Sequence, residues 1–260
     1  MSENAKQGTQ PEETAVDVLI IGGGFSGLCM AIKLRESGMN SFLLIEKSED
    51  IGGTWHDNRY PGCACDIPSH LYSFSFEPSP DWSRMYPGQR EIHDYLKRCV
   101  ERYELVRHIR LDTRFQEAIW NEAESVWHAT AGEGMRIRAK VLISGIGGLH
   151  VPQYPKLTGM ERFAGPKFHS STWNHCVELS AKNVAVVGTG ASAIQFVPQI
   201  APRAGKLSLF QRATALDCAA PGFSHPRPVA AAIPPFPAHH AGVSAIHFLA
   251  AGVPRPRLPR

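Results

Sequence analysis

The sequence predicts an α/β fold of three layers (ββα), built from one complete βαβ unit near the N-terminus and a second, incomplete unit further along the chain. Two observations predict it. Short apolar runs with β-branched residues end in glycine-rich turns at residues 22–27 and 188–193, and a stretch with helical spacing of apolar residues follows each turn. With 43% apolar and 20% charged residues in a chain of 260, a sizeable core can form.

The first βαβ unit has all three of its parts. Residues 16–21 are expected to form a buried parallel strand, because they are apolar and lead directly into glycines. A helix is expected over residues 25–37, ended by Gly38. Residues 41–45 form a second apolar strand, which Glu46 closes.

One further helix and three further strands are expected before the second unit. Apolar residues repeat at helical spacing from 91 to 103, which predicts a helix packed on the sheet. Three β-like stretches at 115–120, 126–130 and 135–144 are separated by short polar or glycine-containing segments. This pattern is typical of an antiparallel meander that returns to a central strand.

The second unit starts like the first and then stops. A strand is expected at 183–187, a helix from the glycine turn to about Ile200, and a strand at 207–210. Beyond Arg212 the composition changes, and the remaining residues hold nine of the 20 prolines. Proline at this density does not allow helices or central strands. A Pro/Ala linker and an out-of-frame or truncated end both fit this tail.

Composition and charge limit the partners. The net charge is +3 and the basic residues are spread out, so neither nucleic acid nor an anionic membrane is expected as a partner. Six cysteines form no CxxC pair, which is typical of a reducing compartment and predicts a cytoplasmic protein. No apolar run approaches 18 residues, so no membrane span is expected. Small-molecule partners are expected, and the oligomeric state is left open.

The first glycine turn satisfies the GxGxxG pattern between a strand and a helix, which indicates a Rossmann-like FAD/NAD(P)-binding fold. Gly22 permits the tight turn, Gly24 lets the backbone approach phosphate, and Gly27 lets helix and strand pack closely. A carboxylate at Glu46 accepts hydrogen bonds from both ribose hydroxyls and repels a 2′-phosphate. The site therefore fits FAD or NAD and not NADP, with FAD preferred. Phe25, Ser26 and Lys47 complete the cofactor-binding residues expected around this turn.

The second glycine turn has Ala193 in place of the third glycine and is followed by a strand that ends at Gln211 and Arg212. A guanidinium stands where the first unit has a carboxylate. Arg212 suits a 2′-phosphate, which favours NADPH as the second nucleotide, although a surface arginine that merely ends a strand is the alternative. The cofactor-binding residues expected here are Gly188, Thr189, Gly190, Ala191, Ser192, Gln211 and Arg212.

The loop between these units is rich in aromatic and charged residues. From Gly53 to Asp66 it reads GTWHDNRYPGCACD. Trp55 can cover an aromatic ring, and Asp66 can orient a cation beside a flavin. A packed Ω-type loop held by its aromatics explains the same residues equally well. Gly53, Thr54, Trp55, Asp66, Ile67 and Tyr72 are the candidate cofactor-binding residues of this region.

The expected domains follow from these assignments. They are a disordered lead (1–15), an FAD-binding domain (16–155), a linker (156–182), a partial NADP-binding domain (183–212), and a Pro/Ala-rich, disordered tail that does not continue the fold (213–260).

Two further patterns make the sequence resemble the type I Baeyer-Villiger monooxygenases, relatives of the flavin-containing and N-hydroxylating monooxygenases. The family signature FxGxxxHxxx(W), followed by Pro or Asp, is matched by Phe163, Gly165, His169 and Trp173, with Asn174 departing at the last position. The pattern Gly-x-Trp-x4-Tyr-Pro-Gly-x3-Asp is met in full between Gly53 and Asp66. The resemblance covers residues 16–212.

The resemblance implies an FAD- and NADPH-dependent oxidoreductase that inserts one oxygen atom of O2 into a ketone through a peroxyflavin, giving an ester or lactone. It implies catalytic roles for Asp66, which would pair with an active-site arginine, and for His169, which would couple the linker to nicotinamide binding. Family members are longer, and no motif of this chain matches that arginine, so whether the chain is an active enzyme is left open. An N- or S-oxygenating flavin monooxygenase and a truncated FAD-binding product without turnover remain as alternatives. For His169, an ordinary hydrogen-bonding residue is the alternative.

Overall fold

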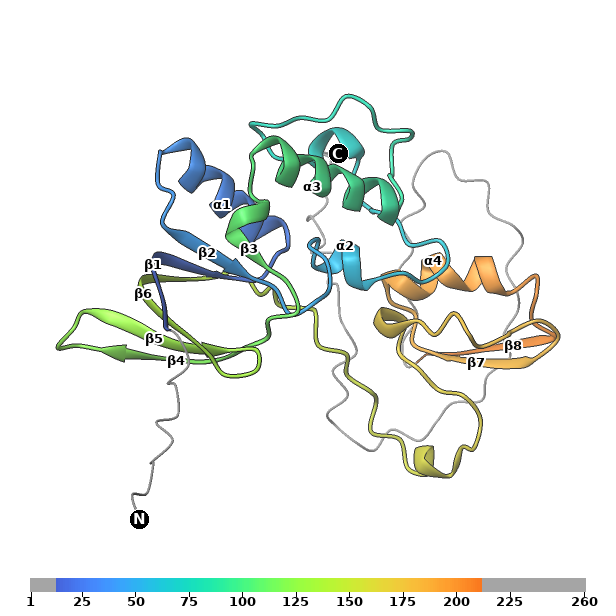
Figure 1. The fold of residues 1–260 in the computed structure, drawn as a ribbon. Helices are drawn as coiled ribbons and strands as arrows, with labels where there is room; N and C mark the ends of the chain where they lie inside the picture. The colour runs from blue at the N-terminus through green and yellow to red at the C-terminus, as the bar shows by residue number, and fades with distance from the viewer. Residues whose placement is uncertain (1–12, 212–260) are drawn as a thin grey trace, which may run out of the picture. The chain divides into compact units, whose positions relative to one another are not determined.

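The computed structural model describes residues 13–211, which form two compact units (Figure 1). Unit 1 contains residues 13–58 and 64–150, and unit 2 contains residues 59–63 and 151–211. The expectations for residues 1–12, for Arg212 and for the tail at 213–260 lie outside the described residues.

Unit 1 is built on one six-stranded sheet in the order β3-β2-β1-β6-β5-β4. The strands β3, β2, β1 and β6 run parallel, and β5 and β4 are antiparallel to their neighbours. The predicted meander that returns to a central strand is confirmed, because β6 pairs with β1 over eight residue pairs. The strands are β1 Glu13–Ile21, β2 Phe42–Ile45, β3 Ile109–Arg110, β4 Phe115–Asn121, β5 Val126–Ala131 and β6 Met135–Ser144.

The expected disordered lead of residues 1–15 is wrong at its C-terminal end. Strand β1 begins at Glu13, and the residues from Glu13 to Ala15 pair in register with Arg136 to Arg138 of β6. Glu13 and Ala15 are exposed, Thr14 is half-buried, and the three carry no apolar pattern, so the sequence gives no local signal for a strand. The long neighbouring strand β6 supplies the backbone partners that extend β1.

Helices lie over one face of this sheet, with α1 and α3 side by side in Figure 1. Helix α1 spans Phe25–Glu36 and α3 spans Gln89–Arg102, each within two residues of the predicted bounds. The predicted buried face of α3 is confirmed, since Ile92, Tyr95, Leu96, Cys99 and Val100 are buried. Three short turns were not predicted: α2 Thr54–Asp57, and the 3-10 turns Ser69–Leu71 and Val106–His108.

The central strands supply the core. All four residues of β2 and the last four of β1 are buried. Leu19 and Ile21 pack in one cluster with Ala129, Ile137 and Ala139 of the meander. Buried strands of this kind require cover on both faces, which the helices and the meander provide.

Unit 2 contains one βαβ unit, with strands β7 Asn183–Val187 and β8 Lys206–Phe210 and helix α4 Ala191–Ile200. The strands pair in parallel, as expected, and form a two-stranded sheet. Two 3-10 turns, Met160–Arg162 and Ser170–Thr172, precede them. The second unit is thus incomplete within the described chain, as predicted.

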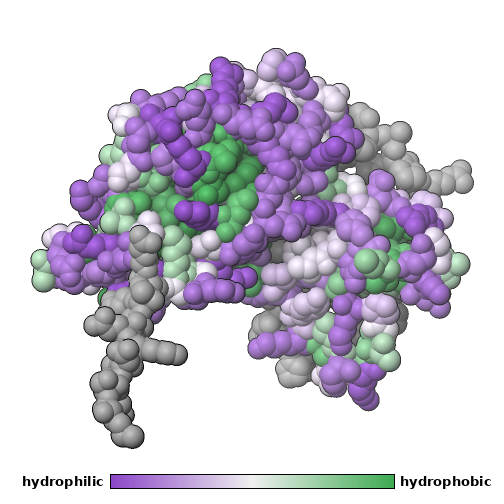
Figure 2. Space-filling view, viewed as in Figure 1, coloured by the Kyte–Doolittle hydropathy of each residue, from purple (hydrophilic) through white to green (hydrophobic). Residues whose placement is uncertain are grey.

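The surface is mixed in character. Figure 2 shows hydrophilic residues over much of the visible face, with apolar residues gathered where α1 and the turn Val106–His108 lie; Val106 itself is 67% exposed. Among residues 13–211, no helix has both the length and the apolar character that a bilayer crossing requires.

Candidate nucleotide-binding sites

The first glycine turn leaves no room for a side chain at Gly22 or at Gly27. Gly22 has φ of +100°, and a Cβ there would lie 2.7 Å from the Gly145 carbonyl oxygen. A Cβ on Gly27 would lie 1.9 Å from the Gly22 carbonyl oxygen. The N–H of Gly22 donates to the carbonyl of Ile45 at 2.8 Å, which fixes the turn to the end of β2. The residues of the predicted fingerprint therefore form a tight strand-to-helix turn.

Helix α1 presents an uncapped N-terminus at this turn. Gly24 is the N-cap residue and makes no side-chain cap hydrogen bond, and the first helical bond runs from the Leu28 N–H to the Gly24 carbonyl at 3.0 Å. The first-turn N–H groups, including those of Phe25 and Ser26, point outward from the helix end and carry partial positive charge. This arrangement fits a phosphate group.

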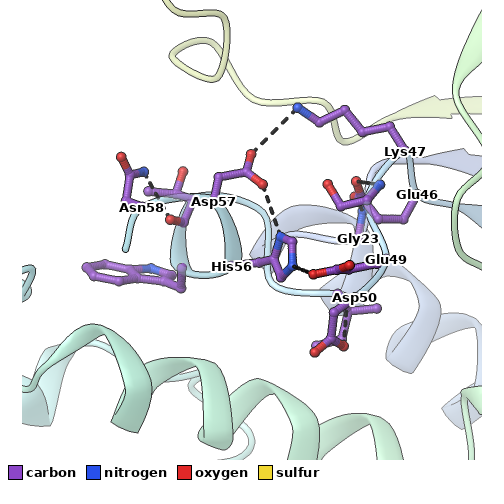
Figure 3. Close-up of polar contacts among 12 residues, drawn as sticks. Gly23, Glu46, Lys47, Glu49, Asp50, His56, Asp57 and Asn58 are labelled. Atoms are coloured by element: carbon purple, nitrogen blue, oxygen red, sulfur yellow. Dashed lines mark hydrogen bonds and ion pairs between the residues drawn. The ribbon is translucent and has the colours of Figure 1, made fainter. Parts of the chain in front are cut away.

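Glu46 faces the turn from the end of β2 and is only 5% exposed. Its Oε2 accepts a hydrogen bond from the Gly23 N–H at 2.6 Å, and its Oε1 accepts one from the Ser48 N–H at 3.0 Å (Figure 3). Backbone donors therefore fix the carboxylate in place. Each oxygen of a carboxylate can accept a second hydrogen bond, which leaves capacity for two hydroxyl donors.

The segment after residue 51 packs closely on the glycine turn. The Gly52 N–H donates to the Gly23 carbonyl at 2.8 Å. A Cβ on Gly53, which has φ of +54°, would lie 3.0 Å from the Cα of Gly24. Backbone meets backbone here without intervening side chains, which is the kind of surface that a ligand can approach closely.

A chain of ionisable side chains lies beside Glu46 (Figure 3). The Lys47 ammonium is 3.6 Å from Asp57 Oδ2, and the His56 Nδ1 is 3.1 Å from Asp57 Oδ1. His56 is buried, and its Nε2 lies 3.9 Å from the Glu49 carboxylate. Of these four residues, only Lys47 is a cofactor-binding residue predicted from the sequence. The others stand within or near the predicted loop, but nothing in their spacing shows which charges pair.

The aromatic residues of the loop form a packed cluster. Trp55 is 7% exposed, and its indole N–H donates to the Tyr72 hydroxyl at 3.1 Å. The Phe25 ring packs edge-on against Tyr72 and Phe74, with centroids 5.4 and 5.2 Å away. Burial raises the pKa of Tyr72, so its hydroxyl stays protonated at neutral pH. This packing agrees with the alternative of a loop held by its aromatics, and it also places Phe25, Trp55 and Tyr72 together.

Asp66 and Ile67 differ from these neighbours because both are exposed. The adjacent Cys65 is buried, and burial raises the pKa of its thiol. Thr54, the first residue of α2, is exposed as well. Within residues 13–211 no cluster of His, Cys, Asp and Glu is arranged to hold a metal ion.

The second glycine turn repeats the backbone of the first. Gly188 has φ of +107°, and its N–H donates to the Phe210 carbonyl at 2.8 Å. Gly190 is the N-cap of α4 without a side-chain cap bond, so the N–H groups of Ala191 and Ser192 stand at an uncapped helix end. Thr189 lies between the two glycines, half-buried, and Gln211 is exposed.

His169 is the N-cap of the 3-10 turn Ser170–Thr172. Its Nδ1 accepts a hydrogen bond from the Ser171 N–H at 3.1 Å and lies 2.8 Å from the Ser171 hydroxyl. Burial lowers the pKa of His169, so the ring is neutral at neutral pH, with its proton on Nε2. The structure thus shows a capping role for this residue. Trp173 lies half-buried against Phe196, with ring centroids 5.1 Å apart.

Known proteins match the sequence of both glycine turns and of the chain between them. A family model described as NAD(P)-binding Rossmann-like domain matches residues 20–87, and one described as L-lysine 6-monooxygenase/L-ornithine 5-monooxygenase matches residues 69–218, more than half of the chain. A Baeyer-Villiger monooxygenase of Pseudomonas aeruginosa is 51% identical over 207 residues, and one of Streptomyces coelicolor is 44% identical over 200 residues. The chain belongs to the flavin-dependent monooxygenases, and within them it is similar to proteins named Baeyer-Villiger monooxygenase.

Coverage and structure add to this family assignment. The matches cover 78% and 77% of this chain but only 39% and 38% of the two relatives, so the chain spans about two fifths of their length. The crystal structure of OTEMO in complex with FAD and NADP matches with a TM-score of 0.72 at 34% identity, covering 77% of this chain and 40% of that one. The Rossmann description of residues 20–87 applies to folds for several dinucleotides, so the ligand of each turn depends on its own residues.

Proposed function

We propose that this chain carries the two nucleotide sites of a monooxygenase that uses FAD and NADPH to insert one oxygen atom of O2 into a ketone. The observation that carries the proposal is the first glycine turn, where an uncapped helix end and a buried carboxylate lie side by side. The FAD-binding domain is assigned to residues 16–155 and the partial NADP-binding domain to residues 183–212, with 156–182 between them.

The residues of the first turn fit FAD. The N–H groups at the start of α1 would hold the pyrophosphate, and Glu46 would accept hydrogen bonds from the ribose hydroxyls. A 2′-phosphate would meet the Glu46 carboxylate at close range, and Lys47, the nearest cation in sequence, is already paired with Asp57. The residues assigned to FAD are Gly22, Gly24, Phe25, Ser26, Gly27, Glu46, Lys47, Gly53, Thr54, Trp55, Asp66, Ile67 and Tyr72.

The second turn is assigned to NADPH. Its helix end is uncapped like the first, and the OTEMO structure contains NADP together with FAD. No carboxylate ends β8, and Gln211 and Arg212 follow it. The residues assigned to NADPH are Gly188, Thr189, Gly190, Ala191, Ser192, Gln211 and Arg212.

The chemistry would come from the cofactors. When bound, FAD reduced by NADPH would activate O2, so that one oxygen atom is inserted beside the ketone carbonyl and the other leaves as water. The exposed carboxylate of Asp66 would stabilise a cation near the reacting centre. His169 would order the chain before β7 through its bond to Ser171, and its neutral ring would leave the Nε2 proton as a donor.

Oxygenation of an amine nitrogen is the second candidate. It is favoured by the match of residues 69–218 to the lysine and ornithine monooxygenase model. Against it stand Trp173 in the signature and the complete Gly53–Asp66 pattern. FAD binding without turnover is the third candidate, because within residues 13–211 the second glycine turn lies on a sheet of two strands only.

Turnover with matched substrates separates these candidates. Purified, FAD-loaded protein is supplied with NADPH, ¹⁸O2 and either cyclohexanone or L-ornithine, and products are analysed by mass spectrometry. One ¹⁸O in a lactone supports the proposal, and one ¹⁸O on the ornithine amine replaces it with the second candidate. FAD binding without NADPH oxidation supports the third candidate. Absence of FAD binding contradicts all three.

A further inference from the structure

Five residues, Arg59–Cys63, belong to unit 2 although the chain on both sides of them belongs to unit 1. We call this segment the strap. On its N-terminal side it continues directly from helix α2 through Asn58, and on its C-terminal side it leads into Ala64, which bridges to Gly88. Tyr60 of the strap is 8% exposed and is part of the core of unit 2. The strap is therefore an integral part of unit 2, the second nucleotide-binding unit.

The strap packs against one face of helix α4. The Tyr60 hydroxyl donates to the side-chain oxygen of Gln195 at 2.9 Å, and its ring packs edge-on against Phe196 with centroids 6.1 Å apart. At Gly62, which has φ of +79°, a Cβ would lie 2.8 Å from Cγ of Gln199 and 2.9 Å from the Gln195 carbonyl oxygen. Gln195 and Gln199 lie one helical turn apart on the same face.

The contact of the strap with α4 lies close to the second nucleotide site, because α4 begins at the second glycine turn. Gln195 lies about one turn after the N-cap Gly190, so the strap holds the helix close to the N–H groups assigned to NADPH. Donors that bind a phosphate act only when they are held in place. Tyr60 does not belong to those donors, and its effect on them runs through α4.

We infer that the strap is a positioning element of the second nucleotide site and that Tyr60 is its positioning residue, an inference that rests on the proposed function. Because the strap is one continuous chain with the loop that carries Trp55 and Asp66, FAD that restrains this loop also restrains the strap. FAD and NADP⁺ then bind cooperatively, and each raises the affinity for the other by the same factor.

Tyr60→Phe in the full chain tests the inference. Dissociation constants for NADP⁺ are measured by calorimetry with and without FAD, and those for FAD with and without NADP⁺. Loss of one hydrogen bond is expected to weaken NADP⁺ binding about fivefold and to lower the factor by which FAD tightens it, while FAD alone binds as to the wild type. Tyr103→Phe is the matched control, because the Tyr103 hydroxyl donates to Glu77 in unit 1 at 2.9 Å, and it should change neither constant.

Gln195→Leu removes the same bond from the side of α4 and replaces Tyr60→Phe if that variant does not fold. If Tyr60 and Gln195 act through their shared hydrogen bond, the effects of the two substitutions do not add. The dissociation constant of the double variant for NADP⁺ then does not exceed the larger of the two single-variant values. A wild type that binds both nucleotides, with unchanged NADP⁺ binding in both single variants, overturns the inference and leaves the proposed function standing. A wild type that binds neither nucleotide overturns the proposed function and the inference with it.

Discussion

Gly22 and Gly188 occupy the same place in two βαβ units of one chain. Their φ angles are +100° and +107°, and each N–H donates at 2.8 Å to the carbonyl of the last residue of the next strand. Their surroundings differ. A Cβ on Gly22 would meet the Gly145 backbone at 2.7 Å, whereas a Cβ on Gly188 would meet nothing within 4 Å in the described part of the chain.

The same difference appears in the strands that carry the turns. Ile21 and Ile45 are 7% and 1% exposed, but their counterparts Val187 and Phe210 are 57% and 40% exposed. The local sequence is thus sufficient to build the turn in both units. Burial depends on neighbouring strands, which unit 1 has and unit 2 lacks within the described residues. The predictions below test this difference.

The largest effect is expected for Gly27→Ala. A Cβ at 1.9 Å from the Gly22 carbonyl forces helix and strand apart, and we expect a loss of about 3 kcal/mol or more in the free energy of unfolding of unit 1. The reverse exchange at the equivalent position, Ala193→Gly, should cost about 1 kcal/mol. Urea unfolding followed by circular dichroism measures both. Equal costs would contradict the view that only the first turn is closely packed.

Gly22→Ala and Gly188→Ala sharpen the comparison at the start of each turn. Both place a side chain at positive φ, which costs about 1 kcal/mol or somewhat more. Gly22→Ala adds the contact with Gly145, so its total cost should reach about 2 to 3 kcal/mol. The measurement is again urea unfolding. A cost at Gly188 that matches the cost at Gly22 would show that the second turn is equally enclosed.

Glu46→Gln tests the carboxylate that only the first turn has. The amide can no longer accept with both atoms, so the hydrogen bonds from the Gly23 and Ser48 N–H groups and from the ribose cannot all form. We expect FAD to bind about 30-fold more weakly, a loss of about 2 kcal/mol. Flavin fluorescence gives the dissociation constants. Glu178→Gln, at an exposed carboxylate of unit 2, is the control and should leave FAD binding unchanged.

The smallest effect is expected for the pH dependence of the free energy of unfolding of unit 2, through His169. The pKa of His169 is lowered by burial, so the folded chain resists a proton that the unfolded chain takes up near pH 6.5. Its capping contribution is therefore present above pH 6.5 and is lost as the pH falls below that value. His169→Asn keeps an acceptor for the Ser171 N–H and does not titrate. The advantage of the wild type in unfolding free energy should shrink between pH 7.5 and 5.5, and a constant difference would refute this.

Much of the fold could be predicted because its signals are local. The apolar strands, the glycines that end them and the helical spacing at 91–103 each lie within a few residues of one another. The position of Glu46 followed from its place at the end of a strand. Features that depend on distant partners were missed. The extension of β1 to Glu13 depends on pairing with β6. The hydrogen bond from Tyr60 to Gln195 of α4 joins residues 135 positions apart.

The spacing of residues in the sequence also does not predict the contacts that His169 and Trp55 make in the folded chain. The resemblance implies that His169 couples the linker to nicotinamide binding, which stays a prediction, and the structure shows the residue as the N-cap of the turn Ser170–Thr172. Trp55 is buried among aromatic residues, which fits the alternative of a loop held by its aromatics, and its contact with a flavin ring stays a prediction. Burial and hydrogen bonding depend on packing, which a pattern of residues does not contain.

In the proposed function, the turn at 22–27 binds FAD and the turn at 188–193 is a separate site for NADP(H). Calorimetric titration of the purified full chain, first with FAD and then with NADP⁺, tests it most directly. We expect one FAD per chain, which excess NADP⁺ does not displace, followed by one NADP⁺. Displacement of FAD by NADP⁺, or a single site for which both nucleotides compete, would contradict the account.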